Sequence, residues 1–380
     1  MGKAASIFLC LAVAALITLG LVMLASASAK WDSDTDQYSF LVRQARWLVV
    51  GVVLMTLMAL MDYRVLQKLS WPLFIGACIA LLLCYVPGIG DDAKGENRWI
   101  ILPVIGRIQP SEPAKLIVMV VLASWFAKHQ AETKSFWKGF VIPSFILGVP
   151  LLLIFFEMDM GTAAGLGAAG LIVFFVSGTR MRYLGTSVFI TLALAYQMVR
   201  TNPNRWERIV AFMDLESYKQ GRGWQQWLAT QAFGNGGTSG MGLGNGVVKQ
   251  MNLPEHHTDF IFPIIGEELG VFVTMGVVLC FVVIFLIGLG ISMQASDRFG
   301  GVLGIGITSA LIIPAMMNLG VTTASLPNTG LPLPFVSYGG SSLIFSFAMI
   351  GVLLSILRRS NVGDVTEMPA LKQKVLEVRL

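Results

Sequence analysis

The chain has 380 residues, of which 55% are hydrophobic and only 13% charged, with a formal net charge of +5. Its mean hydropathy of +0.72 excludes the set of soluble domains that the length alone would allow. The basic residues form no basic helix and no aromatic-basic alternation, so nucleic-acid binding is not indicated.

Apolar stretches of about 15–25 residues recur along the chain, and this is the length that crosses a bilayer as a helix. We therefore predict an all-α, polytopic integral membrane protein, with a transmembrane domain over 1–359 and a charged tail over 360–380. The first stretch is longer than a signal peptide requires, so we expect it to remain as a span. The predicted spans, about ten in number, are 5–29, 46–62, 69–87, 112–127, 139–156, 161–178, 183–199, 260–291, 301–324 and 338–357.

Basic residues in the short connections favour a cytoplasmic location for both termini. The opposite face then carries a loop over about 88–111, a turn at 157–161, a large loop over about 200–259 and the segment 325–337. That outer face also contains Lys and Arg, which the charge rule does not explain. We expect the large loop to be functional, because loops of that length seldom serve as simple connectors.

Polar residues gather before the fourth predicted span, beginning with Arg98 and Trp99. Glu112 and Lys115 lie three positions apart and so share one face of a helix. They form either an ion pair at a capped helix end or a polar patch that opens on a cavity.

The turn between the fifth and sixth spans contains Glu157 and Asp159. Asp159 can cap the next helix. Alternatively it pairs with Lys115, because charges within a membrane protein seek partners.

The run from Gly234 to Gly246 is rich in glycine. No Gly-Lys-Ser/Thr sequence follows it, so a phosphate-binding P-loop is excluded. The run is either a flexible outer loop or a loop whose backbone amides hold an anion.

Asp259 stands at the entry to the eighth predicted span. A carboxylate at a membrane edge is costly unless it faces protein or water, so it is a candidate functional residue. A helix cap is the simpler alternative, and His256 with His257 is a weak candidate for a metal site because adjacent side chains need not converge. Glu267 and Glu268, about two turns further on, are expected to have structural or supporting roles.

Prolines interrupt the segment 331–342 just before the last span, and small residues follow them. Irregular backbone at membrane depth is tolerated only within protein or beside a cavity. This segment, which includes Ser337, is either part of a site or an ordinary loop with tight helix packing.

Taken together and in this order, the motifs resemble those of the SEDS family of bacterial cell-wall proteins, which includes FtsW, RodA and SpoVE. The similarity extends from the first span to about residue 359 and is greater to FtsW than to RodA. One departure is Glu157-Met158-Asp159, where family members often have Gln-Pro-Asp. The motifs that carry the resemblance are Arg98-Trp99, Gln109-Pro110-Ser111-Glu112 with Lys115, Asp159-Met160-Gly161-Thr162, the glycine run, His257-Thr258-Asp259-Phe260-Ile261-Phe262, Gly266-Glu267-Glu268-Leu269-Gly270 and Pro334-Phe335-Val336-Ser337-Tyr338-Gly339-Gly340-Ser341.

The resemblance implies a peptidoglycan glycosyltransferase that polymerises lipid II at the outer face of the bacterial cytoplasmic membrane. It also implies a class B penicillin-binding protein as the partner transpeptidase, along with other divisome or elongasome membrane proteins. The attacking sugar hydroxyl needs a general base, for which Asp259 is the candidate. The departing diphosphate needs a cation, which Arg98, Arg205, Arg208 or a bound divalent ion could supply.

Lys115 and Asp159 are expected to form a structural or positioning pair. The residues expected to bind or position the substrate are Arg98, Trp99, Glu112, Lys115, Asp159, Arg205, Arg208, His257 and Ser337. Two other functional classes remain open from the sequence: a lipid II flippase, and a scaffold that only positions a partner synthase.

Overall fold

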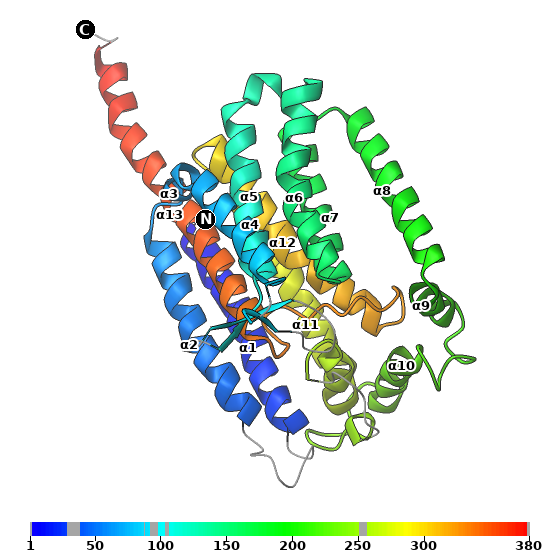
Figure 1. Ribbon diagram of the computed structural model, residues 1–380. Coiled ribbons are helices and arrows are strands. Elements are labelled where there is room, and N and C mark those ends of the chain that lie inside the picture. The colour runs from blue at the N-terminus through cyan, green and yellow to red at the C-terminus, as the bar shows by residue number, and fades with distance from the viewer. Residues whose placement is uncertain are drawn as a thin grey trace.

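The computed structural model describes residues 2–28, 39–86, 88–91, 98–102, 106–250 and 257–377, with only the backbone described at 27, 28, 39, 91, 102, 204, 205, 250 and 361–377. Helices dominate this part of the chain (Figure 1). The α-helices are α1 (Gly2–Ser28), α2 (Ser39–Leu60), α3 (Arg64–Lys68), α4 (Ser70–Leu83), α5 (Ser111–Lys128), α6 (Ile142–Phe156), α7 (Met160–Ser177), α8 (Met181–Thr201), α9 (Pro203–Met213), α10 (Trp224–Gly236), α11 (Ile261–Met293), α12 (Arg298–Thr322) and α13 (Gly340–Glu377).

Each of the predicted spans corresponds to a helix, namely α1, α2, α4, α5, α6, α7, α8, α11, α12 and α13. Seven of the described helices are long and apolar enough to cross a membrane, and they exclude α4, α5 and α8. The α4 helix has only 14 residues, and α5 carries Glu112, Lys115 and Lys128. The prediction of an all-α polytopic membrane protein is confirmed.

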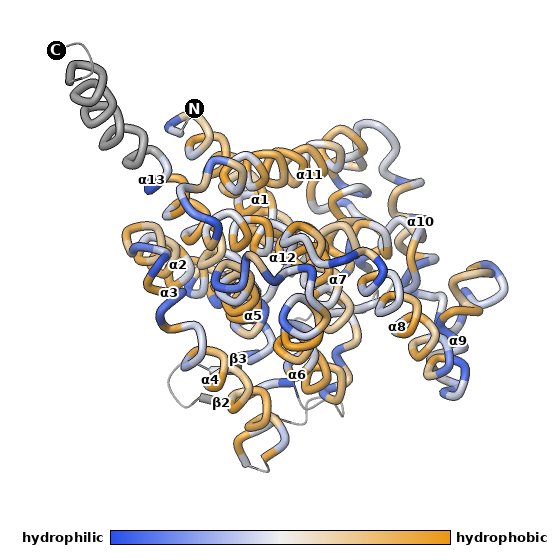
Figure 2. The backbone as a smooth tube through the Cα atoms, turned by 90° about the horizontal axis from the view of Figure 1, so that it is seen from above, coloured by the Kyte–Doolittle hydropathy of each residue, from blue (hydrophilic) through white to orange (hydrophobic). Residues whose placement is uncertain are grey.

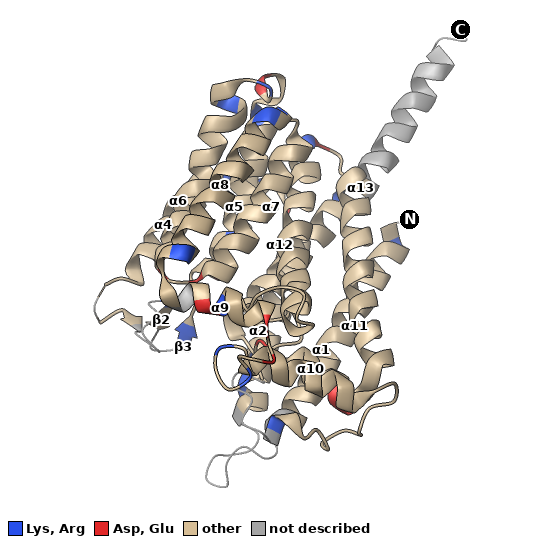
Figure 3. Cartoon of the chain, turned by 90° about the vertical axis from the view of Figure 1, so that its right-hand side faces the viewer, with Lys and Arg blue, Asp and Glu red and all other residues tan. Residues whose placement is uncertain are grey.

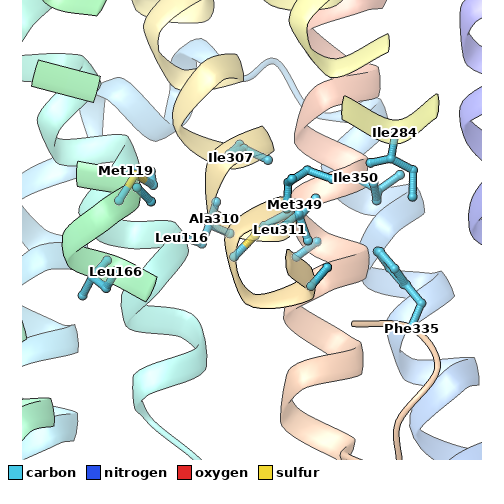
Figure 4. Packing of buried hydrophobic residues seen from close by; sticks show 14 of the residues in the cluster. Leu116, Met119, Leu166, Ile284, Ile307, Ala310, Leu311, Phe335, Met349 and Ile350 are labelled. Atoms are coloured by element: carbon cyan, nitrogen blue, oxygen red, sulfur yellow. The ribbon is translucent and has the colours of Figure 1, made fainter. Parts of the chain in front are cut away.

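The centre of the bundle is formed where α12 packs against α5, α7 and α11, while α13 packs along α2. Orange, apolar segments run through all of these helices, and blue, hydrophilic ones lie mainly in the connections (Figure 2). By contrast, α8 stands away from the bundle (Figure 1) and is exposed along most of its length. Core side chains from several helices pack together (Figure 4), among them Leu116, Met119, Leu166, Ile307, Leu311 and Met349.

A small antiparallel sheet, which the sequence analysis did not predict, occupies the loop before α5. Its strands are β1 (Gly90–Asp91), β2 (Trp99–Leu102) and β3 (Gly106–Ile108), in the order β1-β2-β3. The register places Asp91 opposite Trp99 and Ile100 opposite Ile108. The sheet therefore delivers the chain to the start of α5 in a fixed direction.

The loop predicted over 200–259 is more structured than expected, because it contains α9 and α10. Its glycine run lies against α11 at the point where that helix breaks. Gly270 has φ 77° and ψ −178° inside α11. A Cβ at Gly240 would meet the carbonyl oxygen of Glu268 at 2.3 Å, so glycine is required for the backbones to approach this closely.

The backbone amides of the glycine-rich loop do hold an anion, and it belongs to the protein. The Glu267 carboxylate accepts hydrogen bonds from the amides of Val247 and Val248, at 3.1 Å each. The Glu268 carboxylate accepts one from the amide of Gly244 at 2.9 Å and one from Lys249 Nζ at 2.5 Å. Both glutamates are fully buried, which confirms their structural role.

The N-terminal end of α1 and the C-terminal end of α13 lie at the same end of the bundle (Figures 1 and 3). The strands, α9 and α10 lie at the other end (Figure 3). The backbone of the predicted tail continues α13 as a helix to Glu377. One end of the bundle therefore holds the start of α1, and the other end holds the motifs singled out from the sequence.

Candidate functional site

Asp259 lies directly before α11, at the end of the bundle that carries the sheet. Its side chain is partly buried. Its backbone carbonyl accepts a hydrogen bond from Asn318 Nδ2 of α12 at 2.7 Å. A Cβ at Gly330, where φ is +70°, would lie 3.6 Å from Asp259 Oδ2. The carboxylate is therefore set between the start of α11 and the irregular segment that follows α12.

Ser337 fixes the residue that precedes Asp259. Its hydroxyl donates to the Thr258 carbonyl at 2.6 Å and accepts from the Leu333 amide at 2.8 Å. The next residue, Tyr338, donates its backbone amide to the His257 carbonyl at 3.0 Å. The proline-containing segment is thus joined to the Asp259 segment by several hydrogen bonds, which brings two of the predicted motifs together.

The His257 side chain has aromatic rather than metal-binding surroundings. Its ring centroid is 5.0 Å from that of Phe40 and 6.0 Å from that of Tyr338. Gln44 of α2 contributes to the same cluster, because its Nε2 donates to the Ser337 carbonyl at 3.2 Å. The ring of His257, two residues before Asp259 in the sequence, therefore packs between α2 and the segment 331–342.

Glu112 and Lys115 form a buried ion pair at the start of α5, with 2.9 Å between Lys115 Nζ and Glu112 Oε2. The pair also lines a narrow cavity, of about 10 Å³, together with Pro314 of α12 and Leu331 of the irregular segment. This volume suits about one water molecule. The internal ion pair of the first alternative is therefore present, although no side chain caps α5, and the pair also faces a cavity.

The predicted pairing of Asp159 with Lys115 is wrong. Asp159 caps α7, accepting from the Thr162 amide at 3.0 Å, and its second oxygen accepts from Gln109 Nε2 at 3.0 Å. Glu112 is closer to Lys115 along one helix and supplies the charge that the lysine needs. Asp159 still belongs to the same region, because a Cβ at Gly161 would touch the Thr329 carbonyl and the Leu331 side chain.

Arg98 contacts the turn between α6 and α7, where its Nη2 donates to the Met158 carbonyl at 3.0 Å. Trp99 begins β2 and is partly buried. Arg208 is exposed on α9, a helix that packs against α8. The side chain of Arg205 lies outside the described residues. The structure therefore brings Arg98 to the Asp159 turn, whereas Arg208 lies on a different element.

Glu157, the departure from the family pattern, is a buried carboxyl group in that same turn. It is 1% exposed, and within the described part of the chain neither of its oxygens accepts a hydrogen bond from an oxygen or nitrogen donor. Burial and the nearby Asp159 carboxylate raise its pKa to about 8. Glu157 is consequently protonated at neutral pH.

A metal site does not form from protein side chains in the described ranges, where no three His, Cys, Asp or Glu residues gather. The Asp159 carboxylate is engaged with Gln109 and with the Thr162 amide. A divalent ion at this site would need oxygens from the substrate as well as from the protein.

Three polar residues at this end of the bundle were missed in the sequence analysis: Asn318, Gln44 and Lys249. Asn318 is 2% exposed within the apolar α12, and an amide in such a run is a usable signal, because it needs a partner across the helix bundle. Gln44 lies near the start of α2 and gives a weaker signal. Lys249 follows the glycine run and gives no signal in the sequence that it pairs internally with Glu268.

Comparison with known proteins supplies the family. The family described as "Cell cycle protein", which comprises FtsW, RodA and SpoVE, matches residues 7–362. This chain belongs to that family. The "Probable peptidoglycan glycosyltransferase FtsW" of Geobacter metallireducens is 38% identical over 347 residues, covering 91% of this chain and 92% of that protein. Stage V sporulation protein E of Bacillus subtilis is 35% identical, covering 91% and 94%.

Solved structures show the same fold. A chain from the study "Structural coordination of polymerization and crosslinking by a peptidoglycan synthase complex" superposes with a TM-score of 0.78 at 26% identity, covering 93% of this chain and 97% of the other. The rod shape determining protein RodA of Thermus thermophilus gives a TM-score of 0.67 at 26% identity, covering 92% and 95%. The family expected from the ordered motifs is confirmed.

Proposed function

We propose that this protein is a peptidoglycan glycosyltransferase that polymerises lipid II into glycan strands. Relatives at 35–38% identity bear that enzyme name or the name of a sporulation protein of the same family. The structural observation that carries the proposal is the position of Asp259, which stands between α11 and the irregular segment before α13.

In this reaction a sugar hydroxyl attacks the anomeric carbon of a second, lipid-linked sugar, and the lipid diphosphate departs. Asp259 accepts the proton of the attacking hydroxyl as general base, which requires hydrogen-bond reach to that hydroxyl. Its partial burial favours this role, because a carboxylate with less water around it is more basic. The Ser337 hydroxyl and the Tyr338 amide hold the backbone of the two residues before Asp259.

The leaving diphosphate carries negative charge that must be stabilised as it develops. Arg98 at the Asp159 turn is the best-placed described candidate among the predicted arginines. A divalent ion is the alternative source of positive charge. Glu112 and Lys115 line the cavity. Like Asp159, they are engaged in internal contacts rather than reaching the reacting atoms.

The orientation that suits this chemistry places the termini in the cytoplasm and Asp259 at the outer face of the cytoplasmic membrane. A class B penicillin-binding protein would then supply cross-linking, in keeping with the structural neighbour from a peptidoglycan synthase complex. Other membrane proteins of the division or elongation machinery would join the same assembly.

The test uses the purified full-length chain with fluorescent lipid II, alone and with its partner penicillin-binding protein. We expect the wild type to make glycan strands, Asp259→Asn to make none, and Asp214→Asn to match the wild type. Asp214 is a matched control because it lies in the same large loop and bonds only locally, to the Ser217 amide.

Full polymerisation by Asp259→Asn would remove the general-base role. Transbilayer movement of lipid II without polymerisation would favour a flippase. If the partner made equal amounts of glycan in the presence of the wild type and of Asp259→Ala, the result would favour a scaffold.

A further inference from the structure

Asn318 is a buried amide on α12, four residues after Pro314 and in an otherwise apolar stretch. It is 2% exposed. Burying an amide costs free energy unless its donors and acceptor find partners. Leucine would fill similar space without that cost, so the presence of asparagine calls for a reason.

The amide group connects two separate segments of backbone. Asn318 Nδ2 donates to the Asp259 carbonyl at 2.7 Å and to the Leu331 carbonyl at 2.7 Å. One NH₂ group has two hydrogens, so each carbonyl receives one. Both segments are irregular, and irregular backbone in a membrane protein depends on such donors because little water reaches it.

The two hydrogen bonds that Asn318 donates flank the Asp259 carboxylate. One fixes the peptide at Asp259 itself, and the other fixes Leu331, which follows Gly330. The Gly330 position faces Asp259 Oδ2, at 3.6 Å from an ideal Cβ. The single amide of Asn318 therefore sets how far the carboxylate stands from the wall opposite it.

The oxygen of the amide, Asn318 Oδ1, is buried and accepts no hydrogen bond in the described part of the chain. Turning the amide over would place this oxygen against two carbonyl oxygens, so the hydrogen-bond network assigns its orientation. A side chain retained with an unsatisfied acceptor is better explained by what its donors position than by its own contribution to folding.

We propose that Asn318 is a positioning residue for Asp259: it acts through the backbone to hold the carboxylate at its working distance from the segment 325–337. This inference rests on the proposed role of Asp259 as general base. Asn318 itself does not contact the reacting atoms. Displacement of a catalytic group by about 1 Å can lower a rate by about 100-fold, so loss of this amide lowers kcat rather than substrate affinity.

The experiment compares Asn318→Leu with Thr322→Val in steady-state polymerisation of lipid II. Thr322 is buried one turn further along α12, and its hydroxyl donates only within the helix, to the Asn318 and Leu319 carbonyls. We expect Asn318→Leu to lower kcat by about 100-fold, with KM changed by less than about threefold. The melting temperature should fall, because the Asp259 and Leu331 carbonyls lose this donor. Thr322→Val should retain the wild-type kcat.

Two further measurements keep the result decisive. Asn318→Gln moves the amide by one methylene, and it should lose kcat while remaining folded even if the leucine variant does not fold. Hydrogen exchange followed by mass spectrometry should show faster exchange at 257–262 and 327–336 in Asn318→Leu, and not in Thr322→Val. This readout does not depend on enzyme activity.

Wild-type kcat in both Asn318 variants, beside an inactive Asp259→Asn, would overturn the positioning role and leave the proposed function intact. Unchanged exchange at both segments would overturn it as well. An Asp259→Asn variant with full activity would instead remove the function on which the inference rests.

Discussion

The hydroxyl of Ser337 bridges two backbone segments, donating to the carbonyl of Thr258 at 2.6 Å while accepting from the Leu333 amide at 2.8 Å. Ser355, within α13, makes the same kind of bridge, donating to the Met61 carbonyl and accepting from the Tyr63 amide. Two serines thus do the same structural work, but only one of them lies beside Asp259.

This symmetry gives a test of the Asp259 site. Ser337→Ala and Ser355→Ala each remove a hydroxyl that bridges one carbonyl and one amide, and a buried amide left unsatisfied costs about 1–3 kcal/mol. We expect similar losses of melting temperature. Only Ser337→Ala should also lower polymerisation per folded molecule, by about tenfold, because the Thr258 peptide shifts. Equal activities of the two variants would contradict the site.

Gly330→Ala tests the space in front of the carboxylate. Alanine at a left-handed φ costs about 1–2 kcal/mol, and its methyl group would lie 3.6 Å from Asp259 Oδ2. Gly88→Ala is the matched control, since Gly88 has φ +88° and open space around it. Both variants should lose similar stability, whereas only Gly330→Ala should reduce kcat. A kcat equal to that of the control would show that the wall at 330 does not matter.

Lys249→Met should destabilise the fold strongly. It leaves Glu268, which is fully buried, without its cation, and breaking a buried ion pair costs about 3–5 kcal/mol. The double variant Lys249→Met with Glu268→Gln should recover much of the loss, as measured by thermal unfolding in detergent. Lys219→Met, which breaks an exposed pair with Glu216, should leave the melting temperature nearly unchanged, because solvent screens such a pair.

Glu157 should make stability depend on pH. Burial and Asp159 raise its pKa from 4.5 to about 8. Between these values the folded chain holds a proton that the unfolded chain has lost, so stability falls as pH rises through this range and levels off above about 8. Glu157→Gln removes this dependence. Its advantage in melting temperature should grow from about pH 5 to about pH 9, and a constant difference would contradict the shift.

The spans could be predicted because an apolar stretch of membrane length has few alternatives to a helix. Ordered motifs also identified the family without any knowledge of packing. Side-chain partners were harder to predict, as Lys115 shows: Glu112 and Asp159 were both possible, and the choice depends on how α5 and α7 are placed.

The helices α9 and α10 and the small sheet were missed because they are shorter than a membrane span and lie within stretches that hydropathy assigns to loops. Asn318 was missed for a different reason. Hydropathy treats a single amide in α12 as a minor interruption, whereas its importance comes from two carbonyls distant in sequence.

The break at Gly270 divides α11 into two parts with different tasks. After Gly270, side chains such as Phe272 and Met275 are exposed on the outside of the bundle, so other apolar residues can replace them. Before Gly270, Glu267 and Glu268 accept hydrogen bonds from the glycine-rich loop and hold it against the part of α11 that begins near Asp259. A substitution that straightened α11 at residue 270 would preserve its membrane-spanning part and lose the contacts of Glu267 and Glu268 with the glycine-rich loop.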